Sequence, residues 1–163
     1  MSRAFWQESV NLLACTISFA AAPGEAEEEC CRMARIGLVE IVMTEDIDAL
    51  AFGAPLCLRG ITTSTPTLVV LDRVLSGLGL SGPQFIDMCI LCGSDFTPKA
   101  KGIGPVKALD AMKKYGSIEG FLGRGKSAFP TWSDELFEEF KSTAPEAHAK
   151  FLLNWNLASS SNA

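Results

Sequence analysis

Two pairs of carboxylates bracket an apolar segment and constrain the fold more than any other feature of the sequence. The pairs are Glu25 with Glu27 and Asp46 with Asp48. The sequence between them predicts a helix over residues 26–36, ended by Gly37, and then an aliphatic strand over residues 38–43. One pair therefore stands at a helix start and the other just beyond a strand, where ligands gather in open α/β sheets.

Four carboxylates that face one another repel unless cations lie between them, and hard oxygen ligands suit Mg²⁺ or Mn²⁺. The pair Glu25 and Glu27 has an ordinary alternative explanation, because the helix dipole favours acidic residues in a first turn. Asp46 and Asp48 are harder to explain in this way, since a helix cap accounts for one aspartate and not for two. The pattern predicts a divalent-metal site.

Hydrophobic periodicity and turn signals divide the chain into an α/β region and a helical region. Strands are expected at residues 17–20, 38–43, 56–58 and 67–71, among helices at 5–15, 25–36, 71–78 and 84–91. Only helices are expected afterwards, at residues 105–115, 117–122, 133–141 and 145–155. We therefore expect an α/β part over residues 1–92 and a helical part over residues 93–163, within the length of one domain or of one domain with a small appendage.

Charge is distributed unevenly along the chain. The formal net charge of −5 argues against a uniformly basic nucleic-acid-binding surface. Residues 96–126 are different, because their bases outnumber their two acids, Asp110 and Glu119. These bases are Lys99, Lys101, Lys107, Lys113, Lys114, Arg124 and Lys126. An anionic partner is therefore expected on the helical part of the chain.

A Gly-Ile-Gly-Pro turn at residues 102–105 precedes the helix expected at residues 105–115. Its glycines allow close backbone approach, and proline suits the first position of a helix. Free N–H groups at a helix start and nearby lysines can hold a nucleic-acid backbone without reading bases. The candidate DNA contacts are Lys99, Lys101, Gly102, Ile103, Gly104 and Lys107. The alternative is a plain helix-to-helix turn with solvated lysines.

Six cysteines lie in segments expected to be helix or strand interiors, which is typical of reduced, buried thiols. Cys89 and Cys92 form a CxxC, but a second pair with zinc spacing is missing and the single histidine, His148, is distant. No segment is long enough to span a membrane. We expect an intracellular protein, nuclear if its source is eukaryotic.

Four short motifs follow one another along the chain. They are residues 22–27 (APGEAE), 44–53 (TEDIDALAFG), 91–96 (LCGSDF) and 102–105 (GIGP). In order and approximate spacing the chain resembles the flap endonuclease family of XPG/Rad2-like, structure-specific 5′ nucleases, from about residue 9 to residue 121. The resemblance implies a partial PIN-like, Rossmann-like nuclease core followed by a helix-two-turn-helix region. It also implies metal-dependent phosphodiester hydrolysis in branched or flapped DNA during replication and repair.

The resemblance implies a two-metal mechanism with Mg²⁺ or Mn²⁺, in which one ion activates water and the other stabilises the leaving oxygen. Asp46, Asp48 and Asp95 would hold one ion. Glu25 and Glu27 would reach the other ion or bridge the two.

The chain departs from the family pattern in two places. Lys99 stands where the family commonly has a serine that helps hold a monovalent cation at the turn, so its ammonium either supplies that charge or excludes the ion. Family members also have a region ahead of the stretch that resembles residues 5–15, and this region supplies two further aspartates and a basic residue. We therefore expect this chain to supply five of the seven metal-binding carboxylates of the family pattern. A non-catalytic DNA-binding module and one half of a split nuclease, completed by a second chain, stay open as alternatives.

Overall fold

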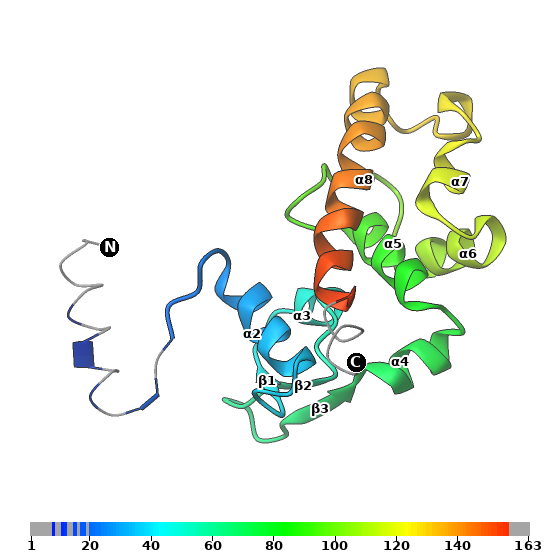
Figure 1. Ribbon diagram of the computed structural model, residues 1–163. Helices are drawn as coiled ribbons and strands as arrows, with labels where there is room; N and C mark the ends of the chain where they lie inside the picture. Colours follow the sequence, from blue (N-terminus) through cyan, green and yellow to red (C-terminus); the bar gives the residue numbers. More distant parts are fainter. Residues whose placement is uncertain (1–7, 9–10, 13–14, 16, 19, 157–163) are drawn as a thin grey trace.

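The computed structural model describes residues 8, 11–12, 15, 17–18 and 20–156, and it places a small sheet beside a group of helices (Figure 1). In chain order the elements are α2 (Ala26–Arg35), β1 (Val42–Met43), α3 (Asp48–Ala51), β2 (Leu56–Arg59), β3 (Thr67–Val70), α4 (Leu71–Leu78), α5 (Gly82–Cys92), α6 (Pro105–Tyr115), α7 (Ile118–Leu122), the 3₁₀ turn η1 (Lys126–Ala128) and α8 (Asp134–Asn156). This order confirms a mixed α/β part followed by helices. The exact boundary expected after residue 92 stays a prediction.

Two of the expected elements fall near the start of the chain. The helix expected at residues 5–15 lies largely outside the described residues. The strand expected at residues 17–20 is not found at Ile17, Ser18 or Ala20, and Phe19 lies outside the description.

The sheet has the order β1-β2-β3, with β1 parallel and β3 antiparallel to β2. In one row across the sheet, Val42 and Val69 flank Cys57 and face the core. Strand β1 pairs over two residues only, although a strand was expected over residues 38–43. An aliphatic run forms a strand only where a neighbour accepts and donates its backbone hydrogen bonds, and residues before Val42 have no such neighbour among the described strands.

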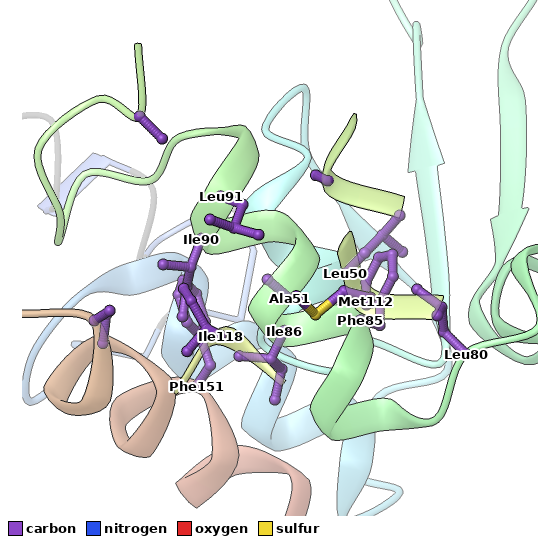
Figure 2. Close-up of a cluster of buried hydrophobic side chains, with 14 of the residues drawn as sticks. Leu50, Ala51, Leu80, Phe85, Ile86, Ile90, Leu91, Met112, Ile118 and Phe151 are labelled. Carbon is purple, nitrogen blue, oxygen red and sulfur yellow. The ribbon is translucent and has the colours of Figure 1, made fainter. Parts of the chain in front are cut away.

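Helix α5 is the centre of the hydrophobic core. Its start is fixed by a capping box, in which Ser81 and Gln84 each satisfy a backbone N–H of the other. Its side chains pack against α3, α6, α7 and α8. Figure 2 shows this cluster, in which the labelled residues of α5 are surrounded by Leu50, Met112, Ile118 and Phe151. The two regions of the chain therefore share one core.

None of the described helices is by itself long and apolar enough to cross a membrane. The combined length and composition of α4 and α5 would suffice, but the two helices meet at a bend of 84°.

Helix α8 is continuous through Pro145, although two separate helices were expected at residues 133–141 and 145–155. The buried positions of α8 follow one stripe at spacings of three and four residues. They are Phe137, Phe140, Ala144, Ala147, Phe151 and Asn154. Because this stripe runs unbroken across the proline, burial against α5 outweighs the loss of one backbone hydrogen bond.

The end of α8 is anchored to the α/β part by Trp155. Its indole Nε1 donates to the carbonyl of Ala51 at 2.7 Å, and its ring covers Gly53 and Gly82. A Cβ at Gly82 would lie 2.5 Å from the ring, so only glycine fits there without rearrangement. Arg35 stacks on the same ring and donates to the Trp155 carbonyl at 2.7 Å.

A buried polar contact joins three of the helices. Asp87 on α5 is 2% exposed and accepts a hydrogen bond from the backbone N–H of Ile118 at the start of α7. Its other oxygen lies 2.5 Å from Nδ1 of His148 on α8. Burial raises the pKa of Asp87, whereas the Ile118 N–H and His148 act in the opposite direction.

The contact predicts a pH-dependent cost for the substitution His148→Ala. We expect a loss of about 3 kcal/mol in the free energy of unfolding near neutral pH, because a buried carboxylate then keeps only one donor. The loss should shrink at acidic pH, since below its raised folded pKa Asp87 is protonated and no buried charge remains to compensate. Urea unfolding at both pH values measures this, with Glu146→Ala on the exposed face of α8 as control. Equal losses at the two pH values would contradict the assignment.

Candidate active site

The two carboxylate pairs meet through Thr44, which follows β1. Its hydroxyl donates to Glu27 at 2.5 Å and accepts from the backbone N–H of Asp46 at 3.0 Å. Asp46 in turn accepts from the backbone N–H of Asp48 at 2.9 Å, at the start of α3. The first turn of α2 is therefore linked to the loop between β1 and α3. Thr44 is the first residue of the motif at residues 44–53, but the sequence did not indicate its role, because that role depends on a contact across 17 residues.

Asp46, Asp48 and Asp95 line one open pocket of about 370 Å³. Asp95 follows the end of α5, where Gly93 turns the chain with a φ of 118°. Lys99 lines the same pocket. From the sequence, Lys99 was expected to contact DNA together with the turn at residues 102–105. In the structure it lines the same pocket as Asp46, Asp48 and Asp95.

Asp48 experiences the charge of all the other predicted carboxylates. Burial, and after it the charges of Asp46, Asp95, Glu27 and Glu25, together raise the pKa of its half-buried carboxyl to about 6. The four other carboxylates are therefore all near enough to Asp48 for their charges to disfavour its ionised form. This mutual repulsion is what a bound cation would relieve.

Glu25 lies at the margin of this group, with its side chain paired to Lys150. The two charged atoms are 3.1 Å apart, and the Lys150 ammonium also lies 3.7 Å from the ring centroid of Phe96. Lys150 belongs to α8, far from Glu25 in sequence, so the packing of α8 is what brings this second base to the site. Sequence reasoning missed it for that reason.

The donor set fits a hard divalent cation, because every candidate ligand is a carboxylate oxygen. Within the described part of the chain, no three His, Cys, Asp or Glu side chains converge closely enough to hold an ion as they stand. Asp46 is held by a backbone N–H and Glu25 by Lys150. An ion would therefore bind only after some of these side chains rearrange.

The predicted turn before α6 has the geometry of an anion contact. Gly102 has a φ of 77°, and Gly104 precedes Pro105 at the first helical position. No described side chain caps this helix start, so its first N–H groups are available to a ligand. The ammonium of Lys107 donates to the carbonyl of Gly102 at 2.8 Å and places positive charge on the turn itself. The neighbouring Lys101 is exposed.

Comparison with known proteins gives a consistent set of relatives. The XPG I-region family model matches residues 16–95. Flap endonuclease 1 of Naegleria gruberi is 41% identical over 150 residues, which cover 77% of this chain and 39% of the relative. The chain thus spans about two fifths of the length of that curated relative.

Solved structures agree on the fold. The catalytic core of Rad2, in complex with a DNA substrate, superimposes with a TM-score of 0.70 at 25% identity and covers 95% of this chain and 49% of that chain. The eukaryotic junction-resolving enzyme GEN-1, with bound potassium, gives a TM-score of 0.56 at 28% identity, covering 88% of this chain and 37% of that one.

The environment of Asp48 predicts a stability change for Asp48→Asn. The pKa of this carboxyl is about 6 in the folded protein, against an ordinary 3.8, so the folded state favours its protonated form. The protein therefore loses stability as the pH rises through 6 and Asp48 ionises. Asp48→Asn should therefore raise the melting temperature at about pH 7 and change it little at about pH 4. Glu138→Gln, at an exposed position of α8, is the matched control. A lower melting temperature for Asp48→Asn at neutral pH would show that the site is not electrostatically strained.

Proposed function

The chain belongs to the flap endonuclease family of XPG-type nucleases, and from this premise we propose that it takes part in metal-dependent, structure-specific hydrolysis of branched or flapped DNA. The observation that carries the proposal is the open pocket lined by Asp46, Asp48 and Asp95, with Glu27 joined to the same loop through Thr44. The acids of the second and third family motifs therefore lie at one pocket.

Divalent-metal dependence is general in this family. Asp46, Asp48 and Asp95 would hold one ion, and Glu25 and Glu27 would reach a second or bridge the two. A bound ion of this kind lowers the pKa of water and stabilises negative charge on phosphate and leaving-group oxygens. Lys99 lines the same pocket, and its ammonium would offset the charge of a phosphate that enters between the carboxylates.

The turn at residues 102–105 would hold the backbone of a DNA duplex through its N–H groups, together with Lys101 and Lys107. Rad2, which shares the fold, has been solved with a DNA substrate. GEN-1 has been solved with potassium, whereas here Lys107 donates to the carbonyl of Gly102. We propose that Lys107 supplies the positive charge of the turn, so that duplex binding does not require a monovalent metal ion.

The sheet offers one observation in favour of a second chain. Met43, Leu58 and Leu68 stand in one row across the three strands, on the face opposite Val42 and Val69. Met43 is 59% exposed and Leu68 50% exposed, so two large apolar side chains of this row face solvent. We propose that a segment carrying the two further aspartates of the family covers this face and completes the site.

Metal binding can be tested by thermal melting with and without Mn²⁺ at millimolar concentration. We expect Mn²⁺ to raise the melting temperature of the wild-type chain, because an ion that binds only the folded state stabilises it. Asp48→Asn should lose most of this shift, whereas Glu138→Gln should keep it. An equal shift in all three proteins would place the ion elsewhere.

Activity can be tested on a 5′-flap substrate with Mg²⁺ or Mn²⁺. Cleavage by these 163 residues alone should be slow, because two aspartates and a basic residue of the family pattern would not be supplied. Losing even one preorganised electrostatic contact typically lowers the rate by about a hundred- to a thousandfold. It should rise when the amino-terminal part of the Naegleria gruberi relative is supplied as a separate polypeptide. Asp48→Ala should abolish cleavage both by the chain alone and by the chain with the added polypeptide. Cleavage that survives this substitution would refute the assignment of the site.

The duplex contact predicts a change in salt dependence. Lys101→Ala and Lys107→Ala should each weaken duplex binding and reduce the slope of log affinity against log salt by about 1, since each lost phosphate contact releases fewer counterions. Arg73→Gln on α4 is the control. Fluorescence anisotropy in potassium and in tetramethylammonium buffers should give the same wild-type affinity. A requirement for potassium would overturn the role given to Lys107.

A further inference from the structure

A second pocket, of about 390 Å³, lies among α6, α7 and η1. It shares no lining residue with the acidic pocket. Its volume falls within the range of about 300–1,000 Å³ that is usual for small-ligand sites. One edge of this pocket is the turn before α6, because Gly102 and Lys107 line it.

Arg124 lines this pocket and is held among aromatic rings. Its guanidinium carbon lies 5.3 Å from the ring centroid of Tyr115, 5.7 Å from that of Phe121 and 5.6 Å from that of Phe129. No carboxylate forms an ion pair with Arg124 among the residues that the structure describes. An arginine oriented by rings keeps its forked N–H donors free, and this is the arrangement that binds phosphate.

Other cations converge on the same pocket. Lys101, Lys107 and Lys114 join Arg124 in its lining, against the single carboxylate of Asp110. Lys114 also lies over the Tyr115 ring, 5.3 Å from its centroid. The pocket is therefore electropositive and suits an anion.

The remaining lining is flat and apolar. Tyr115 is partly exposed, and behind it Phe129 and Trp132 belong to the core. The Trp132 indole N–H is already bonded to the carbonyl of Lys101 at 2.8 Å, so the ring is fixed in place. Among the described residues, none of these four cations forms an ion pair with a carboxylate. An aromatic wall beside such cations matches a nucleotide, whose base stacks on a ring while its phosphate binds cations.

An acidic peptide would also meet these cations, but it has no flat base to lie against the partly exposed ring of Tyr115. Continuity with the turn favours nucleic acid, since Gly102 and Lys107 border both the pocket and the duplex contact of the proposed function, on which this step rests. We propose that this pocket binds one nucleotide of a single-stranded segment. Its phosphate lies on Arg124 and Lys114, and its base lies against Tyr115.

The experiment measures binding of a fluorescein-labelled, 5′-phosphorylated oligothymidine to the full chain by anisotropy, in the absence of duplex. Tyr115→Leu and Arg124→Gln should each weaken binding by at least about fivefold, which is the lower end of the effect of one lost stacked base. Tyr115→Phe, which keeps the ring, and Arg73→Gln, which removes a distant exposed charge, should bind like wild type. Circular dichroism melts verify that each variant is folded.

Three results would overturn the inference. One is unchanged oligothymidine affinity in both Tyr115→Leu and Arg124→Gln. Another is displacement by inorganic phosphate as effective as displacement by thymidine monophosphate, which would leave an anion site without base recognition. The third is equal competition by a short poly-glutamate peptide. Duplex affinity, measured separately, should stay within about twofold in Tyr115→Leu, so failure of the duplex contact and failure of this pocket are distinguishable.

Discussion

The packing of α8 against α5 is the contact on which both candidate sites depend. Helix α5 ends at Cys92, and the turn at Gly93 sets the position of Asp95, while α8 carries Lys150 to Glu25. The end of α8 is fixed where Trp155 covers two glycines that no larger residue could replace without rearrangement. Because these contacts join segments more than 100 residues apart, the acidic pocket exists only in the folded chain.

The acidic pocket shows how a functional site can carry an energetic cost that the rest of the fold offsets. The charge of Asp48 is disfavoured by burial and by its neighbours. Two lysines from separate elements bring positive charge to the acidic residues. Lys150 from α8 pairs with Glu25, and Lys99 from the loop after α5 lines the pocket. Neither lysine is near the aspartates of the second motif in sequence. The carboxylates therefore repel one another at the place where a cation would bind most strongly and where a lysine would meet a phosphate.

Much of the fold could be predicted from local pattern, and the failures have a common physical cause. The helices at residues 26–35, 71–78 and 105–115 were predicted from their apolar periodicity, with Gly37 marking the end of the first and Pro105 the start of the last. The expected strand at residues 38–43 is shorter, and α8 is continuous through Pro145, because partner strands and core burial decide these points. Likewise, the carboxylates could be named from their spacing, whereas Thr44 and Lys150 could not, since both act through tertiary contacts.

The continuity of α8 has a mechanical consequence. A helix of 23 residues is about 35 Å long at 1.5 Å per residue, and its own backbone hydrogen bonds make it stiff. Near its beginning it packs through Phe137 on the aromatic rings below the electropositive pocket, and near its end it carries the lysine beside Glu25. The helix therefore acts as a strut of constant length between the two places. A strand of nucleic acid bound at both places would have to span the distance that this helix sets. The separation between the nucleotide in the electropositive pocket and the bond at the acidic pocket would then be constant.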